Sequence, residues 1–457
     1  MKSVYSQFDD RIRSSLRQYA QLDTDCWSFR TAKTRNQINS FFQYPAMMVP
    51  QMQELLIDTI LDSVPYCRSL FEPFVGAGTV MLAAMKRGLD FTGQDINPLA
   101  ILLCLAKRGP FFDLALREKR KEVLSVISSD RKVNIEADFP NLKKWFDDNV
   151  ALELSKIRRA IRKENSLWCR RFYWVTLAET VRLTSNSRTT TFKLHIKPST
   201  ELKVGNDSPI KIFGELLQKN IDRLQCEKEV LTNVGMLSRG WYRGNVSLRV
   251  KDSAKNGSFT TVSGTETYDL LVTSPPYGDN KTTVPYGQHS FLPLQWIDLS
   301  DISNNLDHGC ISTTHEIDSR SLGGRLRGAI KDRSLFDASK TLSNTVKTLQ
   351  ATSNNCHLRV AAFCRDLNES LKSIIRLLKP DAYMVWTVGN RSVGGLTIEM
   401  DRIVEELLVS NGATTVVRFS RPIPTKRMPR KNNFSNTMSF ETVLILRKKS
   451  AHVRCPR

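Results

Sequence analysis

A short stretch of the sequence, Thr273-Ser274-Pro275-Pro276-Tyr277, has the residue types needed to hold a flat ring that carries an amine. It follows a run of apolar residues that is typical of a buried strand. Two consecutive prolines donate no backbone N–H and have fixed φ angles, so their carbonyls and the Ser274 hydroxyl form a rigid array of acceptors. Such acceptors suit an exocyclic NH₂ group, and Tyr277 offers an aromatic face for stacking. Alone, the stretch is also compatible with a simple strand terminator that ends in a surface aromatic residue.

A second stretch, Glu72-Pro73-Phe74-Val75-Gly76-Ala77-Gly78-Thr79, joins a predicted strand to a predicted helix. Its glycines let the backbone approach a ligand closely, and the start of the helix offers unpaired N–H groups. Asp95 ends the next predicted strand, near the spacing at which a carboxylate holds ribose hydroxyls. A third glycine and a Walker lysine are missing, which argues against the usual dinucleotide site and against a P-loop. A tight strand-to-helix turn without a ligand is the alternative.

The elements that carry both stretches predict an α/β fold with a doubly wound, mostly parallel sheet. Strand, glycine turn, helix, strand and acid make one βαβ unit, and both stretches end predicted parallel strands, where open α/β sheets bind ligands. Further strands are predicted at 246–250, 269–273, 382–388, 414–419 and 442–446. Residues 101–244 are expected to be mainly helical and basic. Residues 280–360 are rich in Ser, Thr, Asn and Gly, which predicts an irregular insertion.

The composition narrows the class of protein. The 457 residues carry 67 Lys and Arg against 46 Asp and Glu, a net charge of +21, and such a surplus attracts polyanions such as nucleic acid. No apolar run is long enough to span a membrane, and the start lacks the apolar core of a signal peptide, so a cytoplasmic protein is expected. The nine cysteines form no C-x-x-C pair, which predicts reduced thiols. His308, Cys310 and His315 fit no ligand spacing, so no metal site is predicted.

These motifs together resemble those of S-adenosylmethionine-dependent amino-methylating DNA methyltransferases. The residues that carry the resemblance are the 72–79 stretch, Asp95-Ile96-Asn97-Pro98 and Thr273 to Tyr277, with further similarity at Tyr44-Pro45-Ala46, Lys251-Asp252-Ser253-Ala254 and Val388-Gly389-Asn390. Stretches 185–188, 279–288 and 423–429 are similar to a subgroup of these enzymes. The resemblance implies a class I methyltransferase-like Rossmann fold and S-adenosylmethionine as cofactor.

The resemblance also implies roles for individual residues. The cofactor would be held by Tyr44, Glu72, Phe74, Gly76, Gly78, Asp95 and Asp252, with Asp95 on the ribose, Asp252 on the adenine amine, and Glu72 near the methionine amino group. The catalytic set would be Ser274, Pro275, Pro276 and Tyr277. DNA binding is expected at Arg188 and Lys193. From its charge, a late basic cluster at 421–457 is also expected to bind DNA phosphates, and a patch kept for solubility is the alternative. This cluster includes Arg421, Lys426, Arg427, Arg430 and Arg447.

The expected organisation is an N-terminal extension at 1–43, whose role is open, and a catalytic domain at 44–100 and 245–450. Two segments interrupt that domain, and either 101–244 or 280–360 is expected to recognise the target sequence. The family further implies site-specific methylation of double-stranded DNA, which protects host DNA beside a cognate restriction endonuclease.

The target amine is predicted from the first catalytic position. Ser274 preceded by Thr273 is typical of cytosine-N4 enzymes, whereas adenine-N6 enzymes more often have Asp or Asn there. Carbon-5 methylation of cytosine needs a cysteine nucleophile, and no Pro-Cys dipeptide occurs in the chain. Adenine-N6 methylation of DNA, amino-methylation of RNA, and a non-catalytic DNA-binding role are the alternatives.

Overall fold

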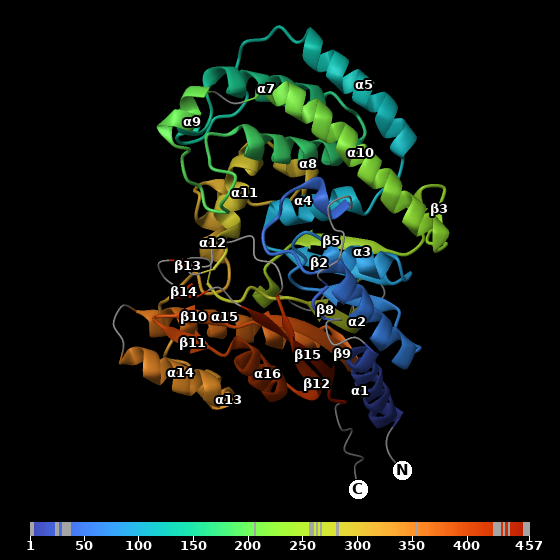
Figure 1. Cartoon of the computed structure of the whole chain (residues 1–457), viewed down its shortest axis with the longest axis vertical. Coiled ribbons are helices and arrows are strands. Elements are labelled where there is room, and N and C mark those ends of the chain that lie inside the picture. Colours follow the sequence, from blue (N-terminus) through green and yellow to red (C-terminus); the bar gives the residue numbers. More distant parts are fainter. Residues whose placement is uncertain are drawn as a thin grey trace.

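A seven-stranded sheet forms the centre of the protein in the computed structural model (Figure 1). The structure describes residues 4–22, 27–29, 38–204, 207–255, 260–261, 264–265, 267–279, 283–351, 355–423, 431–432, 435–436 and 439–450. The strands lie in the order β12 (Ala413–Pro422), β15 (Phe440–Lys448), β9 (Leu378–Gly389), β8 (Tyr268–Thr273), β1 (Ser69–Glu72), β2 (Asp90–Asp95) and β5 (Val246–Val250). Strands β5, β2, β1, β8 and β9 pair in parallel, and β15 is antiparallel to both of its neighbours.

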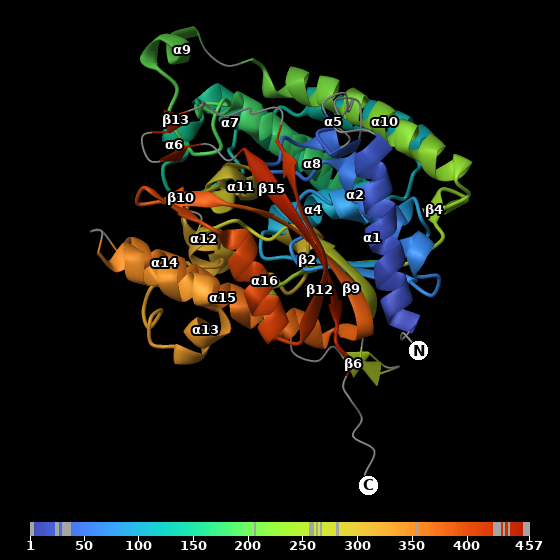
Figure 2. The ribbon, with the colours of Figure 1, turned by 60° about the horizontal axis from the view of Figure 1, so that its bottom comes forward.

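Helices cover both faces of this sheet, because successive side chains of each buried strand point to opposite faces. Leu70 packs into the core of one face and Phe71 into the core of the other. The first face is covered by α1 (Val4–Leu22), α2 (Pro50–Ser63), α3 (Thr79–Met85) and α4 (Pro98–Lys107). The second is covered by α14 (Lys340–Gln350), α15 (Cys356–Arg376) and α16 (Met400–Ser410). Figure 2 shows α1 and α16 flanking the strands. The predicted doubly wound, mostly parallel Rossmann-like sheet is therefore confirmed.

A large helical region is inserted between the adjacent strands β2 and β5, in the upper part of Figure 1. It contains α5 (Asp113–Ser129), α6 (Leu142–Trp145), α7 (Asp148–Arg162), α8 (Leu167–Thr184), α9 (Ser199–Val204), α10 (Pro209–Asn233) and the hairpin of β3 (Leu237–Ser238) and β4 (Trp241–Tyr242). The chain then returns to the sheet beside the strand it left, where the Lys251 N–H donates to the Asp95 carbonyl at 2.9 Å. The predicted helical character of this segment is confirmed.

The expectation of an irregular segment at 280–360 is wrong for much of its length. It contains α11 (Tyr286–Gln295), η3 (Leu299–Asp301), η4 (His308–Ile311), α12 (Glu316–Arg320), α13 (Arg333–Ala338) and α14. The polar residues that look loop-like cap these helices: Asp332 accepts from the Leu335 N–H and Ser339 from the Leu342 N–H. The short helices gain stability from apolar stripes such as Leu342, Val346 and Leu349, which are buried.

The N-terminal helix α1 is tied to the strands that it covers. The Asp9 carboxylate accepts from the Tyr383 hydroxyl at 2.8 Å and pairs with Arg447 at 3.2 Å, and Arg13 Nε donates to the Val416 carbonyl. Residues 4–22 therefore stabilise the sheet, which gives a structural role to part of the 1–43 extension.

The remaining elements are short. They are η1 (Ile38–Phe41), η2 (Ser253–Lys255), and the hairpins of β6 (Thr260–Thr261) with β7 (Gly264–Thr265), β10 (Arg391–Val393) with β11 (Leu396–Ile398), and β13 (Lys431–Asn432) with β14 (Ser435–Asn436). None of the helices in the described ranges combines the length and the apolar character needed to cross a membrane. The seven described cysteines are free thiols, and five of them are buried.

Candidate active site

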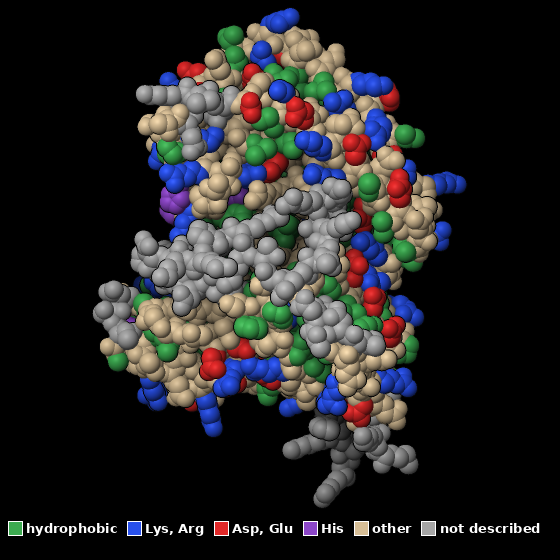
Figure 3. All heavy atoms as spheres, in the orientation of Figure 1, with side chains coloured by type: hydrophobic (Ala, Val, Ile, Leu, Met, Phe, Trp, Pro, Cys, Tyr) green, Lys and Arg blue, Asp and Glu red, His purple; other side chains and the backbone are tan. Residues whose placement is uncertain are grey.

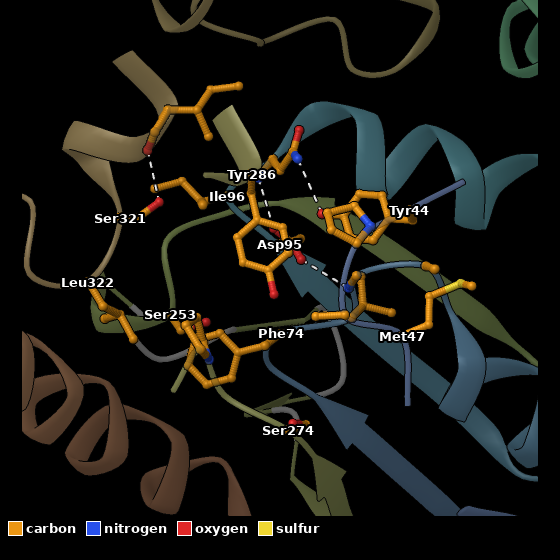
Figure 4. A pocket seen from close by; sticks show the side chains of 18 of the residues that line it. Tyr44, Met47, Phe74, Asp95, Ile96, Ser253, Ser274, Tyr286, Ser321 and Leu322 are labelled. Carbon is orange, nitrogen blue, oxygen red and sulfur yellow. Dashed lines mark hydrogen bonds between the residues drawn. The ribbon is translucent and has the colours of Figure 1, made fainter. Parts of the chain in front are cut away.

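A pocket opens where β1, β2, β5 and β8 end, the edge at which the sequence predicted a ligand (Figure 4). Its walls come from the 44–48 segment, the glycine turn, the ends of β2 and β5, α11, the 317–322 segment and the Thr273–Tyr277 stretch that is predicted to be catalytic, called the catalytic stretch below. Among the sequence-predicted site residues, the lining includes Tyr44, Phe74, Gly76, Asp95, Asp252, Ser274 and Pro276. The structure thus brings together residues from both predicted motifs. Glu72, Gly78, Pro275 and Tyr277 lie outside the lining.

The glycine turn after β1 is held in shape from behind. Gly76 and Gly78 have φ angles of 47° and 78°, and a Cβ atom at Gly78 would lie 2.8 Å from Cys104 Sγ. The Lys107 ammonium is only 1% exposed and donates to the Ala77 carbonyl at 2.6 Å. Burial lowers the pKa of Lys107 to about 8. These contacts hold the turn in shape, and glycine is required at position 78, where the turn meets α4.

Asp95 links the end of β2 to the glycine turn. One carboxylate oxygen accepts from the Gly76 N–H at 3.0 Å and the other from the Asn97 N–H at 2.9 Å. Burial raises the pKa of Asp95 to about 6, although these backbone hydrogen bonds act in the opposite direction. Each oxygen keeps a further lone pair, so the ionised group can accept from hydroxyls of a ligand in the pocket.

Glu72 ends β1 directly behind this turn and is 0% exposed. Neither of its carboxyl oxygens has a hydrogen-bond partner. Burial, followed by the nearby Asp95 charge, raises the pKa of Glu72 well above its usual range. A buried carboxylate without a partner carries a large desolvation cost, and protonation of the group reduces that cost.

Asp252 follows the end of β5, so the inserted helical region does not separate it from the pocket. It accepts from the Ala254 N–H at 3.0 Å and lines the pocket beside Ser253. The Ser253 hydroxyl donates to the Pro73 carbonyl at 2.6 Å. This bond connects the end of β5 to the glycine turn.

Two further pocket residues, Asn97 and Tyr286, lie in stretches that carry the resemblance, but no role was predicted for either of them. Tyr286 begins α11, and its ring stacks on that of Tyr44 with centroids 5.9 Å apart. The Asn97 amide donates to the Tyr44 hydroxyl at 3.2 Å and to Ser290 Oγ at 2.7 Å. Asn97 before Pro98 carries the signal of a helix N-cap, but only the fold shows that it also joins the 44–48 segment to α11.

Ser274 of the catalytic stretch lies at the floor of the pocket in Figure 4. Tyr277 takes part in a hydrogen-bonded chain: its hydroxyl accepts from Ser274 Oγ at 3.1 Å and donates to Glu441 Oε1 at 2.9 Å. Glu441 in turn pairs with Arg421. Burial, followed by the Glu441 charge, raises the pKa of Tyr277 well above its usual range. Its stacking role stays a prediction.

The predicted DNA-binding residues fall into two groups. Arg188 and Lys193 are exposed on a segment that packs on α11, where Phe192 meets His289 edge to face at 5.4 Å. Lys426, Arg427 and Arg430 lie outside the described residues. Two other members of the expected basic cluster do not face solvent as phosphate ligands, because Arg421 pairs with Glu441, and Arg447 pairs with Asp9 and Asp381.

An exposed basic loop lies beside the pocket and was missed in the sequence. Arg325 and Arg327 are exposed and follow Ser321 and Leu322, which line the pocket. The Arg365 guanidinium donates to the carbonyls of Arg327 and Arg325 at 3.0 and 2.9 Å, which fixes the loop backbone. Across the face shown in Figure 3, basic side chains are otherwise interspersed with acidic ones. No cluster of potential metal ligands occurs within the part of the chain that the structure describes.

The sheet order, the glycine turn after β1, the acid after β2 and the serine-proline array after β8 define a methyltransferase of the class I fold. A family model described as D12 class N6 adenine-specific DNA methyltransferase matches residues 54–229. Type II methyltransferase M.MvaI of Kocuria varians is 30% identical over 438 residues, which cover 92% of this chain and 93% of the relative. The chain therefore belongs to the type II methyltransferases and is a DNA methyltransferase.

Two solved structures show weaker likeness. The rRNA methyltransferase aviRa of Streptomyces viridochromogenes has a TM-score of 0.30 at 9% identity, covering 91% of this chain and 93% of that chain. TrmN of Thermus thermophilus has a TM-score of 0.23 at 9% identity, covering 86% of this chain and 48% of that chain. At TM-scores this low, neither likeness bears on the function of this protein.

Family and fold imply S-adenosylmethionine as the methyl donor, and the pocket residues fit it. The Asp95 carboxylate suits ribose hydroxyls, and Asp252 can accept from an exocyclic amine. Phe74, Ile96 and Tyr286 supply apolar and aromatic surface to the same pocket. The Glu72 carboxyl, which the resemblance assigns to the methionine amino group, is fully buried and lies outside the pocket lining.

Proposed function

We propose that this protein methylates the N4 amine of cytosine at a specific sequence in double-stranded DNA, with S-adenosylmethionine as donor. The observation that carries the proposal is the position of Ser274, which lines the pocket together with Asp95 and Asp252. This position supports a target amine and a methyl donor that share one cavity. Ser274 preceded by Thr273 is the form typical of cytosine-N4 enzymes.

The proposed chemistry follows from the acceptors at the floor of the pocket. The exocyclic amine of a base is a poor nucleophile because its lone pair is delocalised into the ring. Hydrogen bonds from its N–H groups to Ser274 Oγ and the Pro275 carbonyl favour a more tetrahedral nitrogen, on which the lone pair is available. When bound, S-adenosylmethionine would supply an electrophilic methyl group: the S–CH₃ bond would break as the N–CH₃ bond forms, the sulfur would keep the electron pair as a thioether, and the amine would lose one proton to water. Most of the rate enhancement then comes from positioning and electrostatics, and the target base must leave the duplex to reach this floor.

Adenine-N6 methylation is the second candidate, favoured by the description of the matching family model. The matched residues, 54–229, include the glycine turn and Asp95 but end before Ser274. That match therefore supports similarity to the family in the glycine turn, Asp95 and the helical region, and it does not extend to the catalytic stretch. The acceptor array, which contacts the target amine, favours cytosine.

A biological role in protecting host DNA beside a restriction endonuclease is part of the proposal. The support is the similarity to a type II methyltransferase over nearly the whole chain. The endonuclease is a functional partner and need not form a complex with this protein.

Nucleoside analysis tests the target. The protein is incubated with mixed-sequence duplex DNA and methyl-labelled S-adenosylmethionine, and the DNA is digested to nucleosides. Label in N4-methylcytosine is the expected result. Label only in N6-methyladenine would establish the second candidate, and transfer to RNA in a parallel reaction but not to DNA would refute both.

DNA binding through the exposed basic loop gives a further prediction. Replacing Arg325 and Arg327 by alanine is expected to weaken DNA binding and to reduce the slope of log affinity against log salt by about 2, because each phosphate contact contributes about 1. Fluorescence anisotropy over a salt series measures both quantities. The matched control is the double replacement of Arg402 and Lys372, which removes the same charge from residues that pair with Glu399 and Glu369. Equal effects of the two double variants would contradict a phosphate-binding loop.

A further inference from the structure

We infer that Glu441, supported by Arg421, is a positioning residue that fixes the hydroxyl protons of Tyr277 and Ser274 so that Ser274 presents only lone pairs to the target amine. The inference rests on the proposed amino-methylation. It concerns two residues that lie outside the catalytic stretch in sequence and reach it from the neighbouring strands β15 and β12 of the same sheet.

The topology explains how Glu441 reaches the site. Strand β15 is antiparallel to β9, so its first residues lie at the edge where β8 and β9 end. Glu441 is opposite Gly389 on one side and opposite Arg421 of β12 on the other. Direct cross-strand neighbours on one face are close enough for their side chains to pair. The pair with Arg421 holds the Glu441 carboxylate beside the Tyr277 hydroxyl.

The number of available protons fixes which group donates in each hydrogen bond of the series Ser274, Tyr277 and Glu441. A carboxylate paired with a guanidinium can only accept, so the Tyr277 hydroxyl must donate its single proton to Glu441. The hydrogen bond between Tyr277 and Ser274 must then be donated by Ser274. The Ser274 proton is thereby directed away from the pocket. This direction matters because a serine proton aimed at the target amine would bind the lone pair that has to react.

The ion pair of Glu441 with Arg421, which ends this series of hydrogen bonds, is well shielded from water. The side chains of Arg421 and Glu441 are 4% and 14% exposed. Arg421 also reaches the Trp27 carbonyl at 3.5 Å. Replacing such a pair by apolar residues of similar volume is often neutral or stabilising, so a buried pair has little value for stability alone. A role in orienting the site gives this pair a function that apolar packing could not supply.

The substitution Glu441→Gln tests the inference. The glutamine oxygen can still accept from Arg421, but its NH₂ group can donate to the Tyr277 oxygen. The Tyr277 hydroxyl would then donate to Ser274, so both hydrogen bonds would run in the opposite direction. We expect kcat for DNA methylation to fall by roughly 10- to 100-fold, the range of one hydrogen bond to a charged group. The melting temperature and the Kd for S-adenosylmethionine should stay unchanged. The matched control is Glu405→Gln, because Glu405 accepts from Thr415 and Arg418 on β12 without contacting the catalytic stretch.

A double-mutant cycle separates orientation from structural support. Tyr277→Phe removes the link between Ser274 and Glu441, so adding Glu441→Gln to that variant should change kcat no further. Additive losses would overturn the inference, as would a Glu441→Gln enzyme with unchanged kcat or one that loses cofactor binding in parallel with activity. If the unaltered protein methylates no nucleic acid, the proposed function fails and the inference fails with it, a result distinct from the others.

Discussion

The Tyr277→Ala variant is expected to lose about 1000-fold in kcat for DNA methylation while its Kd for S-adenosylmethionine stays within about twofold, since one preorganised group at a reacting centre is worth about that much. The substitution removes the aromatic face offered to an extruded base and also leaves Ser274 without its hydrogen-bond acceptor. Tyr277 does not line the pocket in which the cofactor residues lie, so donor binding should survive. Single-turnover kinetics and calorimetric titration measure the two quantities.

The matched control for this prediction is Tyr66→Ala, an aromatic residue 45% exposed that packs on Phe8 of α1. Its kcat should equal that of the unaltered protein. Equal loss of kcat and of cofactor affinity in Tyr277→Ala would contradict the base-stacking role, because it would indicate collapse of the pocket as a whole.

The Asp95→Ala variant is expected to bind S-adenosylmethionine at least about 100-fold more weakly, the value of roughly two charge-assisted hydrogen bonds. The change removes the acceptors proposed for the ribose hydroxyls and frees the Gly76 N–H from its partner. Calorimetric titration measures the Kd. A suitable control is Asp58→Ala, which removes the partner of Arg87 away from the pocket lining. Unchanged affinity in Asp95→Ala would contradict the ribose assignment.

The same residue sets the pH dependence of cofactor binding. The pKa of Asp95 is raised to about 6, so the carboxylate is ionised at neutral pH and becomes protonated as the pH falls through 6. Affinity should therefore be level above about pH 7 and fall below 6, and Asp95→Asn should remove this dependence. Stability responds in the opposite direction: because the folded-state pKa lies above the unfolded value near 3.8, protonation of Asp95 between pH 6 and 4 stabilises the fold.

The sequence predicts the sheet well because its strands are short apolar runs that end in recognisable turns. The predicted strand at 246–250 coincides with β5, and the strand that ends at Thr273 begins one residue earlier than expected. The glycine turn and the two acids that follow β2 and β5 reach one pocket, as parallel topology requires. In this part of the site, several of the residues predicted from the sequence line the pocket.

The rest of the site depends on contacts that no local pattern reveals. Tyr286 reaches the pocket only because α11 packs against α4 and α8, and the polar composition around it suggests a loop. Arg421 belongs to a run of basic residues that reads as a surface clamp, yet the antiparallel register places it opposite Glu441. Charge counted along the chain cannot show which cation has an acidic partner on the neighbouring strand.

The position of β5 at the edge of the sheet has a consequence for cooperativity. Among the residues that the structure describes, this strand pairs with β2 alone, yet the segment that follows it carries Asp252 into the pocket. The whole helical region lies between the two strands in the chain, so any opening that detaches β5 also removes one wall of the donor site. A ligand that contacts both Asp95 and Asp252 therefore binds only when the helical region is docked, and by linkage its binding energy opposes undocking. Donor binding and docking of the helical region are then coupled through one edge strand, with no hinge or lid required.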